Sequence, residues 1–316
     1  MNKERFFKDI SEYRSAIMGL AIIAIILFHQ KFVTAFPLSI FQYYGYWGVD
    51  VFLLLSGMGL VNSLHKNPIR QYYQRRIIRL APSCVLCGVL KCIIFLLLGV
   101  FITGTDKLHL NWLSPLGLDL WYIRAILVYY LISPLLYKYL EKSPWLTMAA
   151  ILLFFTVNEL FFRIHDSNSP TWIPERLPIF TIGMLLVIRK GILSAKTMAL
   201  SIGFLMLAIG IVAIYKENIY STLPWAAHMF ALAFGTTGII RILTFLFKYI
   251  PLSLLSPIQW IGTISLEIYV IHEFIFGVIR ISLGSQYNPL FLLLLGITLS
   301  ILIAYLCKWA TDIIKR

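Results

Sequence analysis

The sequence has few charged residues for its length. Only 13% of its 316 residues are Asp, Glu, Lys or Arg, whereas 59% are hydrophobic. A water-soluble domain of this size needs far more polar surface to cover itself, so a soluble globular protein is excluded. Cysteines are also few, and Cys84 and Cys87 form a CxxC inside an apolar run. Small buried thiols explain this pair better than metal or redox chemistry, and no metal is expected.

The chain also lacks internal repeats, low-complexity segments and any polar stretch long enough for a separate soluble domain. Long apolar runs take their place, each near the roughly 20 residues that cross a bilayer core. The runs are continuous rather than alternating, which favours helices over a β-barrel. We therefore predict an all-α, polytopic integral membrane protein, with residues 1–316 as a single domain. About ten transmembrane helices are expected, near residues 15–35, 46–63, 82–103, 119–137, 145–162, 177–188, 198–214, 223–247, 258–279 and 289–309.

Acidic residues are scarce, 14 against 27 Lys and Arg, giving a net charge of +13. Cytoplasmic loops of membrane proteins concentrate Lys and Arg, which explains the excess better than nucleic-acid binding does. Fifteen of the 27 cations precede the first apolar run or fall in the even-numbered connections: Lys3, Arg5, Lys8, Arg14, Lys66, Arg70, Arg75, Arg76, Arg79, Lys138, Lys142, Arg189, Lys190, Lys196 and Lys248. We therefore expect a multi-pass protein of the cell membrane with both termini cytoplasmic and a retained first span.

His29 is the first candidate for chemistry. It ends the apolar run LAIIAIILFHQ, about 22 Å along a helix from Arg14. An imidazole in an apolar span is costly unless it has a partner or a function. Water or a carbonyl at the outer end of the span could satisfy it. A neutral imidazole is also well suited to remove a proton from a hydroxyl.

The second candidate segment is GVDVFLLLSGMGL, residues 48–60, which places Asp50 and Ser56 in an apolar span. Gly57 and Gly59 are most simply packing positions that let helices approach closely. Asp50 is harder to explain by packing. It could stand at a helix N-terminus, or it could orient a cationic or imidazole group.

The third segment is RQYYQRRIIRLAP, residues 70–82, in which Arg75, Arg76 and Arg79 lie within one helical turn. Topology and lipid headgroups explain the charge but do not require this clustering. The planar fork of arginine holds phosphate oxygens in pairs. A cytosolic nucleotide-bearing cofactor such as coenzyme A is therefore a natural ligand.

The fourth segment is WIGTISLEIYVIHEFIF, residues 260–276. Ser265, Tyr269 and His272 follow one another at i, i+4 and i+7 along one stripe of a helix, with Glu267 and Glu273 nearby. So many polar groups exceed what structural satisfaction usually needs, which favours a functional site. A transporter's binding site could look similar.

Taken in this order, the four segments resemble the membrane-bound acyltransferase family 3, polytopic enzymes that O-acylate surface polysaccharides and other extracytoplasmic acceptors. The resemblance covers nearly the whole chain, and its order and spacing are more specific than any one motif. It runs through MGLAIIAIILFH, GVDVFLLLSG, YQRRIIRLAP, LWYIRAILVYYLISPLL, RLPIFTIGM and IGTISLEIYVIH.

The resemblance implies that His29 is the catalytic residue. The other positions that match family motifs are Ser56, Gly57, Arg75, Arg76, Arg79, Pro82, Trp121, Tyr130, Pro134, Arg176, Pro178, Phe180 and Gly183.

Two departures from the family pattern stand out. Where the family commonly has an arginine eleven residues before the catalytic histidine, this chain has Met18, and Arg14 lies one turn earlier. Arg14 is therefore a candidate to bind the donor in its place. Ile126 and Leu127 stand where many members have acidic residues.

The leading hypothesis is thus a membrane-bound O-acyltransferase that moves acetyl from cytosolic acetyl-CoA to a hydroxyl of an exopolysaccharide or another cell-envelope glycan, lipid-linked or not. His29 would act as general base or as a transient acyl carrier, and the sequence leaves both open. The rival is a transporter or flippase for a glycan or lipid-linked substrate, which would more typically show internal repeats. A purely structural role would leave His29 and His272 unexplained.

Overall fold

The computed structural model describes residues 3–35, 37–99, 108, 110–162, 172–215, 221–284 and 286–315. Within these ranges all regular structure is helical and no strand occurs, which confirms the predicted all-α class. The principal helices are α1 (Lys3–His29), α2 (Phe41–Tyr44), α3 (Trp47–Lys66), α4 (Ile69–Gly99), α5 (Trp121–Lys142), α6 (Pro144–Val157), α8 (Trp172–Ile188), α9 (Ala195–Tyr215), α10 (Thr222–Phe247), α11 (Leu252–Thr263), α12 (Ser265–Leu283) and α13 (Pro289–Ile314). Shorter 3₁₀ turns occupy Leu38–Ile40, Ser114–Leu116 and Lys190–Ile192, and a π-helical turn follows α6 at Asn158–Phe162.

Eight of the described helices are long and apolar enough to cross a membrane. They are α1, α3, α4, α5, α6 with its π-helical turn, α9, α10 and α13. The 17-residue α8 and the 19-residue α12 complete the set of ten predicted segments. The chain is a multi-pass membrane protein.

Two element boundaries differ from the sequence expectation. Helix α4 begins at Ile69 rather than near residue 82, so the arginine segment is part of the helix and Pro82 lies inside it. The segment predicted as 258–279 is divided into α11 and α12, because Ile264 has φ −108° and ψ 15°, outside the helical range. The stripe that contains Ser265 therefore starts a new helix.

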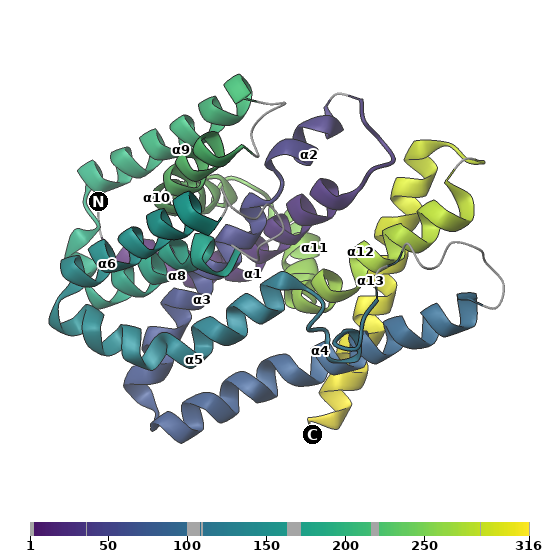
Figure 1. Ribbon diagram of the computed structural model, residues 1–316, viewed down its shortest axis with the longest axis horizontal. Coiled ribbons are helices and arrows are strands. Elements are labelled where there is room, and N and C mark those ends of the chain that lie inside the picture. Colours follow the sequence, from purple (N-terminus) through teal and green to yellow (C-terminus); the bar gives the residue numbers. More distant parts are fainter. Residues whose placement is uncertain are drawn as a thin grey trace.

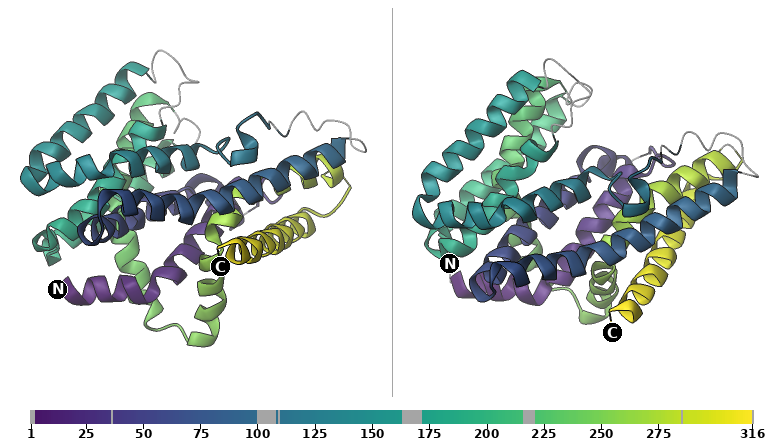
Figure 2. Two further views of the ribbon diagram at one scale, coloured as in Figure 1. Left: turned by 90° about the horizontal axis from the view of Figure 1, so that it is seen from below. Right: turned by 60° about the horizontal axis from the view of Figure 1, so that its bottom comes forward.

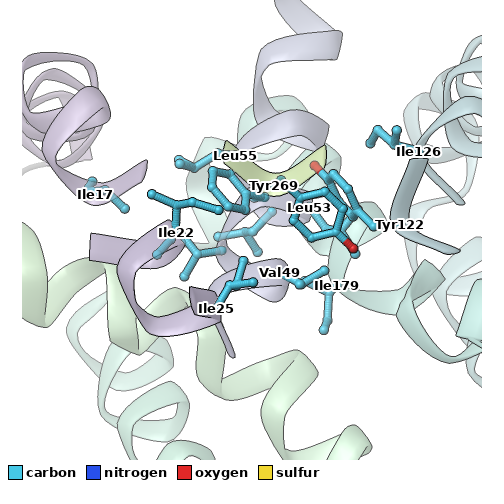
Figure 3. Packing of buried hydrophobic residues seen from close by; sticks show 14 of the residues in the cluster. Ile17, Ile22, Ile25, Val49, Leu53, Leu55, Tyr122, Ile126, Ile179 and Tyr269 are labelled. Carbon is cyan, nitrogen blue, oxygen red and sulfur yellow. The ribbon is translucent and has the colours of Figure 1, made fainter. Parts of the chain in front are cut away.

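Helices α1 and α3 pack against each other at the centre of the bundle, and α3 is the most buried of the spans. On one side lie α6, α9 and α10, and on the other lie α4, α12 and α13 (Figures 1 and 2). Helix α8 packs against α3, and α11 packs against α1. Residues from α1, α3, α5 and α12 meet in the core, where Ile22, Leu55, Tyr122 and Tyr269 lie together (Figure 3).

Glycines permit the closest of these helix contacts. A methyl group at Gly57 would overlap the carbonyl oxygen of Phe180 in α8, and one at Gly183 of α8 would overlap that of Leu54. Gly19 and Gly262 hold α1 against α11 in the same reciprocal way. In lipid, where apolar helices gain little by avoiding solvent, such backbone proximity is a main source of association energy.

The packing expectation holds at Gly57 but not at Gly59. A methyl group at Gly59 would meet only the Arg14 guanidinium, at an ordinary contact distance of 3.6 Å. Gly59 instead lines a cavity.

Segments between helices that carry Lys or Arg lie beside the first turns of α1. Lys248 Nζ lies 2.5 Å from Asp9 Oδ2, and the Lys190 ammonium lies 5.7 Å from the centre of the Phe7 ring. Arg189 Nη2 donates to the carbonyl oxygen of Glu141 at 3.0 Å. The connections after α5, α8 and α10 therefore lie on the same side of the bundle as the first turns of α1.

We predict that Gly57→Ala lowers the free energy of unfolding by about 1–3 kcal/mol, because the added methyl must push α3 away from α8. Thermal unfolding in detergent measures the loss. Gly59→Ala is the matched control, since the same substitution two residues later meets only a flexible side chain. Equal melting temperatures for the two variants would contradict the close-packing role of Gly57.

Candidate active site

The first cavity, of about 210 Å³, lies between α1, α3, α4, α5 and α12, and we call it the arginine cavity. It is lined by Arg14, Met18, Phe52, Leu55, Ser56, Gly59, Arg76, Arg79, Leu80, Tyr122, Tyr130, Ser265, Leu266 and Tyr269. Seven of the site residues predicted from the sequence therefore meet in one place: Arg14, Ser56, Arg76, Arg79, Tyr130, Ser265 and Tyr269.

Three guanidinium groups give the arginine cavity its character. Arg14 Nη2 donates to the carbonyl oxygen of Leu55 at 3.2 Å. The other N–H groups of this guanidinium are available to a molecule bound in the cavity. The guanidinium of Arg76 lies 5.6 Å from the ring centre of Tyr72 and 5.9 Å from that of Tyr130. Its Nε is buried without a hydrogen-bond partner among the described residues. Such a concentration of planar donors suits a phosphate or another oxyanion.

The second cavity is larger, about 920 Å³, and lies at the other end of α1. We call it the histidine cavity. It is lined by Phe28, His29, Gln30, Lys31, Thr34, Gln42, Lys91, Leu108, Leu110, Asn111, Asp119, Leu120, Val270, Glu273, Phe274, Gly277 and Arg280. Side chains of both charges and three amides line it, so it can hold a hydroxyl-rich or charged molecule.

A buried ion pair in the wall of the histidine cavity was missed by the sequence reasoning. Lys91 Nζ lies 2.8 Å from Asp119 Oδ2, and the Lys91 side chain is only 2% exposed. A single lysine in the apolar run 82–103 was the signal that could have drawn attention to it, since an intramembrane cation needs a partner. Asp119 lies just before α5, so only the fold identifies it as that partner.

His29 and His272 form a dyad that joins α1 to α12. His272 Nε2 lies 3.1 Å from His29 Nδ1. His272 Nδ1 lies 3.0 Å from the carbonyl oxygen of Ile268 and 2.9 Å from that of Tyr269, so this nitrogen must carry the proton. The Nε2 of a neutral His272 is then an acceptor.

The dyad thereby sets the tautomer of His29. Both partners of its Nδ1, His272 Nε2 and the carbonyl oxygen of Ile25 at 3.0 Å, are acceptors, so Nδ1 donates. The basic lone pair of neutral His29 is therefore on Nε2. Because His29 also lines the histidine cavity, it combines a fixed tautomer with access to that space. This is the arrangement that a general base requires.

Asp50 belongs to a different cluster. It lies in the first turn of α3, is fully buried, and accepts a hydrogen bond in an ion pair with Arg176 of α8. The Arg176 guanidinium also lies 5.7 Å from the Tyr46 ring and 5.9 Å from the Trp121 ring. The expectation that Asp50 orients a cation is thus met by Arg176, and these contacts hold α3, α5 and α8 together.

Three further predicted residues lie outside both cavities. Glu267 is buried and accepts a hydrogen bond from Ser83 Oγ at 2.6 Å, which ties α12 to α4. Trp121 packs beside Arg176. Arg75 is exposed on α4, one turn from Arg79, and is not part of the cavity lining. No cluster of three or more His, Cys, Asp and Glu in the described ranges could hold a metal ion.

Comparison with known proteins gives one match. A family model described as an acyltransferase domain matches residues 16–309, which include the second half of α1, all helices from α2 to α12 and most of α13. No curated protein and no solved structure matches the chain.

We predict that, at neutral pH, His29 carries its proton on Nδ1 and has an unprotonated Nε2. Nitrogen-15 NMR of histidine-labelled protein in bilayers measures this directly, with His29→Gln identifying the signals. Exposed His65 serves as the internal control, because solvent does not fix its tautomer. A proton found on His29 Nε2 alone would contradict the hydrogen-bonding of the dyad.

Proposed function

This chain belongs to the acyltransferase family, and from that premise we propose that it is a membrane-bound O-acyltransferase that moves an acetyl group from cytosolic acetyl-CoA to a hydroxyl of a cell-envelope glycan. The observation that carries the proposal is the position of His29. It lines one large polar cavity, and through His272 it lies next to the wall of a second, arginine-rich cavity.

The arginine cavity is the proposed donor site. Arg14, Arg76 and Arg79 would hold phosphate oxygens of coenzyme A, and the unpartnered Nε of Arg76 is available for such a contact. Met18, at the position where the family commonly has an arginine, lines the same cavity as Arg14. This proximity supports the hypothesis that Arg14 supplies the missing charge from one turn away.

The proposed orientation places the arginine cavity toward the cytosol and the histidine cavity toward the outer face. The gathering of Lys190, Arg189 and Lys248 beside the first turns of α1 supports a cytoplasmic N-terminus by the positive-inside rule. An even number of spans then puts the C-terminus on the same side.

The histidine cavity is the proposed acceptor site. Its volume of about 920 Å³ and its mixture of amides and paired charges suit a sugar unit of an exopolysaccharide or of a lipid-linked glycan. The lining contributed by Lys91, Asp119, Glu273 and Arg280 offers donors and acceptors for several hydroxyls.

The chemistry follows from the tautomer of His29. Nε2 accepts the proton of the acceptor hydroxyl while the oxygen attacks the carbonyl carbon of the thioester. The carbon–sulfur bond then breaks, and the imidazolium returns the proton to the leaving thiolate, so an ester and a free thiol are formed. His272 holds the ring of His29 through Nδ1 and stabilises the transient cation by accepting that hydrogen bond.

We predict that His29→Gln lowers the rate of acyl transfer by at least about 100-fold, because positioned general bases contribute roughly 10²–10⁴-fold. The measurement is mass spectrometry of envelope glycans from cells that express each variant, scored for ester-linked acetyl. The control is His228→Gln, which changes another buried histidine in a cluster with Tyr46 and Trp225.

Transfer by His29→Gln within a few-fold of the wild type would remove His29 from the mechanism. A wild-type protein that changes the location of a glycan without adding an acyl mass would instead identify a transporter.

We predict that Arg79→Gln raises the Kd for coenzyme A by about 10-fold or more, because a charge-assisted hydrogen bond contributes about 1.5–3 kcal/mol. Isothermal titration of the purified protein with coenzyme A measures the change. Arg75→Gln is the matched control, since it removes the same charge from the same helix outside the cavity. If both variants bind coenzyme A equally well, the arginines determine topology only.

A further inference from the structure

Two tyrosines pack against each other in the wall of the arginine cavity. Tyr122 of α5 and Tyr269 of α12 both line the cavity, and both are nearly buried, with exposed fractions of 8% and 5%. Their ring centres are 4.9 Å apart with the planes inclined by 62° (Figure 3). Phe52 of α3, with its ring centre 6.4 Å from that of Tyr122, borders the pair.

Tyr269 connects this pair to the dyad. The ring centre of Tyr269 is 5.8 Å from that of His272, whose Nε2 contacts His29 Nδ1 at 3.1 Å. His29 in turn lines the histidine cavity. Tyr269 and His272 are three residues apart on α12, so one helix face leads from the arginine cavity to the dyad. Tyr269 therefore lies between the arginine cavity and the dyad, and Tyr122 packs against it from α5.

We propose that Tyr122 and Tyr269 form a gate through which the acyl end of the donor reaches His29, and that the opening they leave selects short acyl groups. The inference rests on the proposed function and adds to it the residues that determine donor specificity. The tyrosines take no part in bond making, since the ester forms and the thioester breaks beside His29 as described above.

A gate at this place would also discriminate between acyl groups by their chain length. With the phosphates held by arginines at one end of the cavity, the thioester can advance only as far as the tyrosine pair allows. An acetyl group extends one methyl beyond the carbonyl carbon, and each further methylene must fit between the rings. Discrimination of roughly 10–200-fold per methylene is typical of closely fitting apolar pockets.

The test compares acyl donors of different length. Full-length protein in lipid nanodiscs is given acetyl-, propionyl- or butyryl-CoA, with the envelope glycan fraction of cells lacking the gene as the acceptor. The ester-linked acyl groups are measured by mass spectrometry, and Kd for free coenzyme A is measured separately. The expected result for Tyr269→Ala is a butyryl-to-acetyl rate ratio at least about 10-fold above that of the wild type, with Kd for coenzyme A changed by less than about twofold.

Tyr129→Ala is the matched control. Tyr129 is an equally buried tyrosine of α5 that packs on Phe180, away from both cavities. The Tyr129→Ala substitution creates a void of the same size away from the proposed gate. Its butyryl-to-acetyl rate ratio should therefore equal that of the wild type. Tyr269→Trp tests the opposite change, because the larger side chain narrows the proposed gate and creates no void. It should lower acetyl transfer by about 10-fold while Kd for coenzyme A stays constant.

An unchanged ratio in an active, folded Tyr269→Ala protein would overturn the gate. If that variant does not fold, Tyr122→Leu and Tyr269→Trp decide the question, and full acetyl transfer by Tyr269→Trp would overturn it as well. These results differ from a failure of the proposed function, in which the wild-type protein would transfer none of the three acyl groups.

Discussion

The close approach of α1 to α11 is the contact on which the candidate site depends. Gly19 and Gly262 each face the backbone of the opposite helix, and Gly262 lies two residues before the break that starts α12. The contact therefore fixes where α12 begins relative to α1. At the other end of the same pair of segments, His29 and His272 come within hydrogen-bond distance. In a bilayer, where the hydrophobic effect between helices is weak, small residues are what permit such a fixed geometry.

Buried charges add a second constraint. The pairs Asp50–Arg176 and Lys91–Asp119 each connect two segments that are distant in sequence. An unpaired charge in a medium of low dielectric constant costs several kcal/mol, roughly, so separation of either pair is strongly disfavoured. Asp50–Arg176 joins α3 to α8 outside both cavities. Lys91–Asp119 joins α4 to the start of α5 in the wall of the histidine cavity, where its polar atoms are also available to a bound molecule.

Much of the candidate site could be predicted from local sequence pattern. His29 was identified as an imidazole in an apolar run, and the i, i+4, i+7 spacing placed Ser265, Tyr269 and His272 on one stripe of a helix. The local sequence pattern could not predict that this stripe has two different surroundings. Ser265 and Tyr269 line the arginine cavity, whereas His272 contacts His29. Nor could it separate Gly57 from Gly59, because their difference lies in what the neighbouring helix presents.

The sequence by itself determined the class of the protein and the helical form of its membrane segments. These follow from length and apolarity, because a backbone in lipid must satisfy its own hydrogen bonds. Only the tertiary structure decided which polar residues become partners. Lys91 meets Asp119, Asp50 meets Arg176, and His29 meets His272 across 243 positions of sequence. Periodicity specifies the face of a helix on which a residue lies, but the neighbour of that face depends on packing between helices, which no local pattern contains.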